Sequence, residues 1–271
     1  MFSGGCAFKS IKRSKNIAYL PADTVEGKPA QKLNVFYPKK TGQPKAVFIF
    51  IYGGNWNSGR KGIYSFFGSR LARKGIVTVI PDYPKTPKAN YNEMAADMAL
   101  AVKWVKEHIA AYGGDPAKIY LSGHSAGGHL AALIGIKNSW FDTFHIANPV
   151  KGLVLIDAAG LDMYGYLREE GFDENQTYIK TFGNDPKSWK AASPMYFLHD
   201  SMPPILMFEG GRTYPSIAES TERFLNAMKP YKLQPIFQLQ PKKKHVAMIL
   251  QFFNSNNKKY GEIIKFMKDN G

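Results

Sequence analysis

Short apolar runs with strand character alternate along most of the chain with longer segments whose apolar positions recur at helical spacing. The predicted strands end at Gly, Pro or polar residues and span 33–37, 46–51, 76–80, 118–121, 152–156, 205–208 and 235–239. The predicted helices span 64–74, 92–111, 129–136, 217–228 and 262–268. Strands that alternate with helices predict an α/β fold, in which a doubly wound, mostly parallel sheet carries helices on both faces.

Residues 157–203 interrupt this alternation. The stretch is rich in aromatic residues and glycine, including Tyr166 and Tyr178, and shows few clear strands. It lies between two predicted core strands, and the functional site of such a sheet lies at the carboxyl ends of its strands. We therefore expect a small cap or lid over that end, with an ordinary surface insertion as the alternative.

The bulk composition favours one soluble α/β domain. A chain of 271 residues with 44% hydrophobic content can bury one large core, and we place this domain at 32–271, after an N-terminal extension at 1–31. The formal net charge of +15 is dispersed along the chain, and neither an Arg-rich helix nor an aromatic-basic RNA motif is present. We therefore predict no nucleic-acid partner, and the charge leaves attraction to anionic polysaccharide or membrane surfaces open. No run approaches the roughly 18 apolar residues of a transmembrane helix.

Cys6 is the only cysteine, which excludes an internal disulfide and a metal site built from cysteines. Small residues precede it, as at the end of a bacterial lipoprotein signal, but no charged or apolar signal region comes before them. Two interpretations stay open: an upstream signal is missing from this sequence, or the similarity is accidental. The compartment, exported or cytoplasmic, is left undecided.

The strongest chemical motif is Gly123-His124-Ser125-Ala126-Gly127. It fits Gly-x-Ser-x-Gly, the nucleophile elbow, in which a serine sits on a strained strand-to-helix turn that tolerates only small neighbours. A strand-like run precedes the motif and a small, apolar, helix-compatible run follows it. Ser125 is therefore the candidate nucleophile; the alternative is a Gly-rich turn that only packs.

A serine hydroxyl needs a base and an oxyanion hole to attack a carbonyl. His245 follows the last predicted strand, where the base of a doubly wound hydrolase lies, and the alternative is a surface histidine. Gly53, Gly54 and Asn55 directly follow the strand at 46–51 and are expected to form the oxyanion hole with the backbone N–H of Ala126.

These motifs resemble, in order, those of the α/β-hydrolase fold, and within it the esterases related to hormone-sensitive lipase and to carbohydrate or feruloyl esterases. The resemblance runs from Lys32 onward and includes the segments 53–61, 81–83, 112–129 and 192–194. It implies a serine esterase of small carboxylic esters that works through an acyl-enzyme, without a metal or organic cofactor. An amidase or peptidase of the same fold, and a pseudoenzyme that only binds, are the alternatives.

The chain departs from the family pattern at two positions. Tyr52 stands where the family usually has the His of His-Gly-Gly, so the support of the oxyanion loop differs. Thr213 stands where relatives carry the acid of the triad. Three interpretations compete: Glu209 reaches back to His245, Asp157 or Asp162 after the preceding strand takes over, or Thr213 alone bonds the histidine. We place Glu209 first, because its side chain starts close to the expected position.

Overall fold

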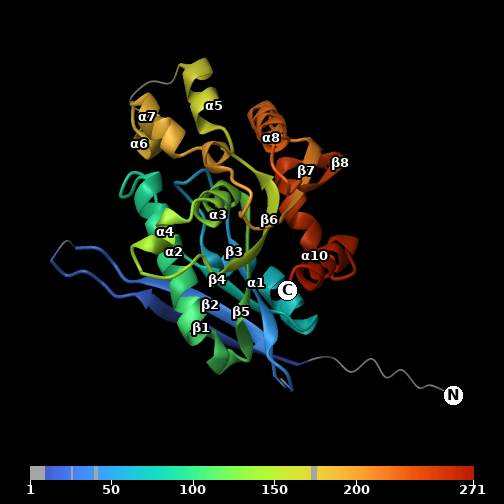
Figure 1. Ribbon diagram of the computed structural model, residues 1–271. Coiled ribbons are helices and arrows are strands. Elements are labelled where there is room, and N and C mark those ends of the chain that lie inside the picture. The colour runs from blue at the N-terminus through green and yellow to red at the C-terminus, as the bar shows by residue number, and fades with distance from the viewer. Residues whose placement is uncertain (1–9, 26, 40–41, 172–175) are drawn as a thin grey trace.

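The computed structural model describes residues 10–25, 27–39, 42–171 and 176–271, so Cys6 and the lipoprotein-like residues around it lie outside the described part. Eight strands form a single sheet in the order β1-β2-β4-β3-β5-β6-β7-β8 (Figure 1). Their bounds are β1 (Ile11–Leu20), β2 (Gln31–Pro38), β3 (Lys45–Ile51), β4 (Val77–Pro81), β5 (Gly114–Ser125), β6 (Val150–Ala158), β7 (Ile205–Arg212) and β8 (Ile236–Lys244). The pairs from β4 to β8 are parallel and only β1 and β2 run antiparallel to their neighbours, which confirms the predicted mostly parallel sheet.

The register of the central strands brings their carboxyl ends to one edge of the sheet. Ile51 at the end of β3 pairs with Gly123 of β5, and Ser125 at the end of β5 pairs with Ala158 of β6. These strands are covered on both faces, which is why they read as continuous apolar runs rather than as an alternating pattern.

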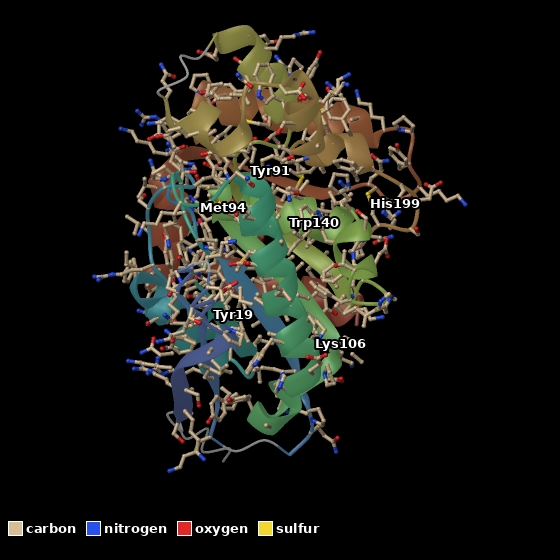
Figure 2. All side chains as sticks on the ribbon, turned by 90° about the vertical axis from the view of Figure 1, so that its left-hand side faces the viewer. Tyr19, Tyr91, Met94, Lys106, Trp140 and His199 are labelled. Atoms are coloured by element: carbon tan, nitrogen blue, oxygen red, sulfur yellow. The ribbon has the colours of Figure 1, made fainter. Side chains whose placement is uncertain are left out.

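Helices cover both faces of the sheet. Their bounds are α1 (Ser65–Arg73), α2 (Tyr91–His108), α3 (Ala126–Ile136), α4 (Ser139–Asp142), α8 (Pro215–Met228), α9 (His245–Leu250) and α10 (Lys258–Asp269). Short 3-10 turns span η1 (Lys61–Tyr64), η2 (Ile109–Tyr112), η3 (Pro194–Phe197) and η4 (Gln251–Phe253). Helices α1 and α10 pack together through Phe67 and Tyr260, whose ring centroids are 5.8 Å apart. Figure 2 shows α2 on the other face, running from Tyr91 near the excursion to Lys106.

The excursion between β6 and β7 contains three short helices, α5 (Met163–Glu170), α6 (Thr177–Phe182) and α7 (Pro186–Ala191). The side chain of Asp162 caps α5, and Asp185 with Pro186 at the first turn begins α7. Figure 1 shows these helices beyond the carboxyl ends of the central strands. Helices this short have too few turns to show a periodic apolar pattern, so apolar periodicity did not predict them.

Strand β1 belongs to the same sheet, although it lies before the domain boundary expected at residue 32. It pairs antiparallel with β2 and shifts register between Ser14 and Ile17, where Asn16 has a positive φ of 58°. Most of its side chains are exposed or half-buried and several are charged, as is common for an edge strand. That exposure removes the apolar alternation by which a strand is recognised in a sequence. None of the helices in the described residues is long and apolar enough to cross a membrane.

Candidate active site

Ser125 lies on the sharp turn between β5 and α3. Its φ of 56° is in the left-handed region, which an ordinary residue enters only under strain. A Cβ on Gly123 would collide with the backbone of Gly127, and one on Gly127 with the backbone of Ile51. The two glycines are therefore required by the close approach of β5, α3 and β3, and the motif is a structural elbow.

His245 begins α9 directly after β8 and faces the serine. Its Nε2 is 2.9 Å from Ser125 Oγ, and its Nδ1 is 2.6 Å from Asp157 Oδ2. With the proton on Nδ1, the ring donates to the carboxylate and accepts from the serine hydroxyl. The Asp157 side chain is fully buried and the His245 side chain only 12% exposed, so this chain of groups is shielded from water.

Asp157 is held at the end of β6 by bonds to both carboxylate oxygens. The backbone N–H of Gly210 donates to Oδ1 at 2.7 Å, and the Thr213 hydroxyl donates to Oδ2 at 2.5 Å. Asp157 itself has a positive φ of 47°, which turns its side chain toward the neighbouring strand β7. Thr213, at the position where the sequence analysis expects the acid, thus supplies a hydroxyl that orients a carboxylate from the preceding strand, β6.

The sequence analysis placed Glu209 first as the acid, but Glu209 makes no hydrogen bond to His245. The carboxylate that contacts His245 is Asp157. Glu209 is 9% exposed, and its Oε2 has no hydrogen-bond partner among the described residues. Burial raises its pKa, a hydrogen bond from Thr221 lowers it, and the charge of Asp157 raises it further. Asp162 caps α5 and pairs with Arg223 at 3.1 Å instead.

The oxyanion segment lies against the elbow. A Cβ on Gly53 would come within 2.8 Å of the Ser125 Cβ, and Gly54 has a φ of 139° that favours glycine. In the described part of the chain, the backbone N–H groups of Gly54 and Asn55 donate to no acceptor. Ala126 is the first residue of α3, so its N–H has no acceptor within the helix. These N–H groups are free for a ligand at Ser125.

Tyr52 supports this loop in a different way from the usual histidine. Its hydroxyl donates to Asp82 Oδ1 at 2.8 Å, and its carbonyl accepts from the Tyr83 hydroxyl at 2.9 Å. The rings of Tyr52 and Tyr83 stack with centroids 4.9 Å apart. Lys61 Nζ lies 2.5 Å from Asp82 Oδ2 and completes the cluster. The loop is therefore anchored from beneath by buried aromatic rings and one carboxylate.

Two further histidines of the elbow have structural contacts. His129 accepts from Trp56 Nε1 at 3.1 Å on Nδ1 and contacts the Ala192 carbonyl at 2.6 Å through Nε2. Burial lowers the pKa of His129 to about 4, so the ring is neutral and donates to that carbonyl. His124 stacks on His245, and its Nε2 contacts the His245 carbonyl at 3.1 Å. Burial lowers the pKa of His124 to about 4 as well, which keeps a second positive charge away from His245.

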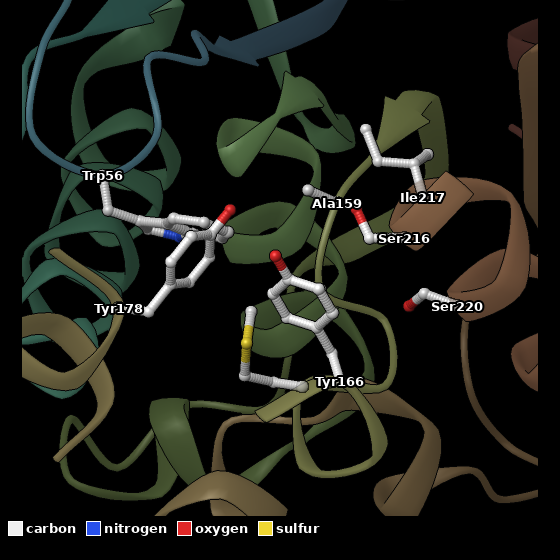
Figure 3. Close-up of a pocket in the computed structure, with 9 residues that line it drawn as sticks. Trp56, Ala159, Tyr166, Tyr178, Ser216, Ile217 and Ser220 are labelled. Atoms are coloured by element: carbon white, nitrogen blue, oxygen red, sulfur yellow. The ribbon is translucent and has the colours of Figure 1, made fainter. Parts of the chain in front are cut away.

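A narrow cavity of about 20 Å³ lies between the loop after β6, the excursion and α8 (Figure 3). Its wall includes Ala159, whose backbone N–H donates to the Ser125 carbonyl at 3.1 Å, and Trp56 from the oxyanion loop. Tyr166 and Tyr178 enter from the excursion with ring centroids 5.3 Å apart. Among the described residues, no group of three or more His, Cys, Asp or Glu side chains could hold a metal ion.

The sheet, the elbow and the serine–histidine–carboxylate geometry define an α/β-hydrolase. The profile of the BD-FAE family matches residues 33–218, and the chain belongs to this family.

Among curated proteins, an isoprenylcysteine alpha-carbonyl methylesterase of Arabidopsis thaliana is 27% identical over 82% of this chain and 55% of its own length. Esterase LipQ of Mycobacterium tuberculosis is 30% identical over 69% of this chain and 46% of its own length. The chain thus spans about half the length of these curated relatives.

Two solved structures share the fold. A truncated carbohydrate esterase from gut microbiota superposes with a TM-score of 0.81 at 19% identity, covering 97% of both chains. An inhibited esterase B from Lactobacillus rhamnosis gives a TM-score of 0.78 at 18% identity, covering 96% of this chain and 87% of the other.

Proposed function

We propose that the protein is a serine esterase that hydrolyses small carboxylic esters through an acyl-enzyme. One observation carries this proposal: Ser125 Oγ, His245 Nε2, His245 Nδ1 and Asp157 Oδ2 form a continuous hydrogen-bonded chain with contacts of 2.9 and 2.6 Å. The esterase names of the curated relatives support it.

In the first half-reaction, His245 Nε2 accepts the proton of Ser125 as Oγ attacks the ester carbonyl. The oxyanion that forms takes hydrogen bonds from the free backbone N–H groups of Gly54, Asn55 and Ala126. Collapse of the tetrahedral intermediate expels the alcohol, which takes the proton from His245. Water then attacks the acyl-serine with the same base, releases the carboxylic acid and regenerates Ser125.

Asp157 stabilises the imidazolium that forms on His245 in both steps. Its Oδ2 accepts from His245 Nδ1 and its Oδ1 accepts from the Gly210 N–H. Both hydrogen bonds are in place before substrate arrives, so no reorganisation is needed when charge develops. The stacked neutral ring of His124 adds no opposing charge.

The excursion acts as a cap that limits the acyl group. Tyr166 and Tyr178 narrow the cavity that Ala159 joins to the elbow, and a volume of about 20 Å³ has no room for a long acyl chain. The interior carries no cationic or anionic side chain, so the acyl part is small and uncharged.

Steady-state hydrolysis of p-nitrophenyl acetate and of p-nitroacetanilide tests the proposal. We expect turnover of the ester and little of the anilide, and loss of ester turnover in Ser125→Ala to the buffer rate. A folded wild-type protein without turnover of the ester would favour the binding protein that keeps the fold but not the chemistry. Faster cleavage of the anilide would assign the site to amides.

A further inference from the structure

A ridge of exposed apolar side chains leads away from the active site. We call it the apolar ridge and define it by five residues on η1, α1, α9 and η4: Ile63, Phe66, Val246, Leu250 and Phe253. Four of them are about half exposed, at 52% for Ile63, 54% for Val246, 48% for Leu250 and 50% for Phe253. Exposed apolar patches of this kind are uncommon on a soluble monomer unless they bind something.

Local geometry makes the ridge continuous. Val246 and Leu250 are one helical turn apart on α9, and Phe253 follows at the next turn in η4. Phe253 stacks on Phe66 with ring centroids 3.7 Å apart, and Ile63 lies one turn before Phe66. The ridge thus joins two segments that are nearly 200 residues apart in the sequence. One of its residues, Val246, directly follows the candidate catalytic His245.

The stretches of sequence around the ridge residues are rich in cations. Residues 57–81 and 223–261 contain thirteen Lys and Arg residues and no Asp or Glu, and of these Lys61, Arg223 and Lys259 pair with carboxylates of other segments. Three of these cations, at 242–244, immediately precede His245 and lie at one end of the ridge. A surface of half-exposed apolar side chains set among cations has the composition of an interfacial lipid-binding site.

The other end of the ridge opens into a polar cleft of about 510 Å³. Ile63 lines it together with Lys15, Asn16, Asn34 and Arg60. Lys61 also lines this cleft but is held by Asp82 at 2.5 Å. Neither Lys15 nor Arg60 makes an ion pair with a described residue, so both can meet a phosphate group.

A second copy of the chain is a poor occupant for the ridge. A stable protein interface buries about 800 Å² on each partner and involves roughly 20–30 residues a side, far more than five side chains. Two copies would also bring together two molecules that each carry a net charge of +15.

We propose that the apolar ridge docks on an anionic phospholipid bilayer. The apolar side chains enter the headgroup region and the flanking cations pair with lipid phosphates. Because Val246 follows His245 on α9, the docked orientation brings the active site close to the membrane surface. This binding does not depend on the proposed esterase activity, because none of the residues of the ridge takes part in the chemistry.

Co-sedimentation with phospholipid vesicles tests the proposal. The full chain is expected to pellet with vesicles of phosphatidylcholine mixed with phosphatidylglycerol, to stay in solution with phosphatidylcholine alone, and to be released by high salt. Leu250→Ser/Phe253→Ser should bind the anionic vesicles at least about tenfold more weakly. Ile236→Ser/Leu239→Ser is the matched control, because these β8 side chains are 52% and 51% exposed and lie off the ridge. Circular dichroism melts establish that both variants are folded.

Three outcomes overturn the proposal. In the first, the wild-type protein fails to bind anionic vesicles. In the second, the ridge variant binds as well as the control, so that charge alone explains the attachment. In the third, sedimentation velocity shows a wild-type dimer that the ridge variant abolishes, which assigns the ridge to a second copy of the chain.

Discussion

Replacing Asp157 with asparagine changes which ring nitrogen of His245 carries the proton, while it preserves the shape of the site. Gly210 N–H donates to Asp157 Oδ1, so the amide oxygen of the variant takes that position and its NH₂ group takes the position of Oδ2. That NH₂ group then faces His245 Nδ1, which lies 2.6 Å from Oδ2 in the native protein. A donor at this position forces the ring proton to Nε2, where it can no longer accept from Ser125.

The expected cost follows from this tautomer change. Loss of the acid of a serine triad by an Asp-to-Asn change lowers turnover about 10⁴-fold, equivalent to about 5 kcal/mol in the activation free energy. Because Asp157 is fully buried, water cannot substitute for the missing acceptor. The fall should appear in kcat, with KM changed little, because the carboxylate touches His245 and not the substrate.

Glu209→Gln is the matched control. Glu209 is also a buried carboxyl at a strand end, but its side chain bonds to Thr221 rather than to His245. We expect its kcat on p-nitrophenyl acetate to fall less than about tenfold. The reverse result, near-normal turnover in Asp157→Asn and a collapse in Glu209→Gln, would refute the assignment of the acid.

Three further substitutions test neighbouring contacts. Thr213→Val removes the hydroxyl that orients Asp157, so kcat should fall about tenfold and Thr213→Ser should restore it; equal loss in both variants would contradict a hydrogen-bonding role. His129 has a pKa of about 4 when folded and about 6.5 when unfolded, so its contribution to stability is complete above pH 6.5 and is lost as the pH falls toward 4. Urea unfolding should therefore show that His129→Gln removes about 2 kcal/mol of the difference in the free energy of unfolding between pH 7 and pH 5. The same pH dependence in the variant and the wild type would exclude His129 as its source. Tyr166→Ala and Tyr178→Ala widen the cavity, so kcat/KM for the butyrate ester should rise relative to acetate, and an unchanged ratio would place the acyl group elsewhere.

The parallel core was predictable because its buried strands leave continuous apolar runs and its helices carry clear periodicity. Strand β1 left no such pattern, because an edge strand with charged side chains lacks apolar alternation. The helices of the excursion are too short for periodicity, and only their caps at Asp162 and Asp185 mark them.

The site was partly predictable for the same kind of reason. The elbow is local, so the residues around Ser125 identify it without a structure. The acid is not local. Asp157 reaches His245 only because β6 pairs with β7 and β7 with β8, and the separation of these residues along the chain does not predict that pairing. Thr213 at the expected acid position showed that the acid had moved, but it did not separate Glu209 on the same strand from Asp157 on β6, and we placed Glu209 first.

The most direct measurement is labelling with a fluorophosphonate followed by mass spectrometry of the digested protein. We expect one stoichiometric adduct, on the peptide that contains Ser125, and none in a folded Ser125→Ala variant. Asp157→Asn should label far more slowly than the wild type, because the probe reports activation of the serine. A folded wild-type protein that is not labelled, or an adduct that persists in Ser125→Ala, would contradict the proposed mechanism.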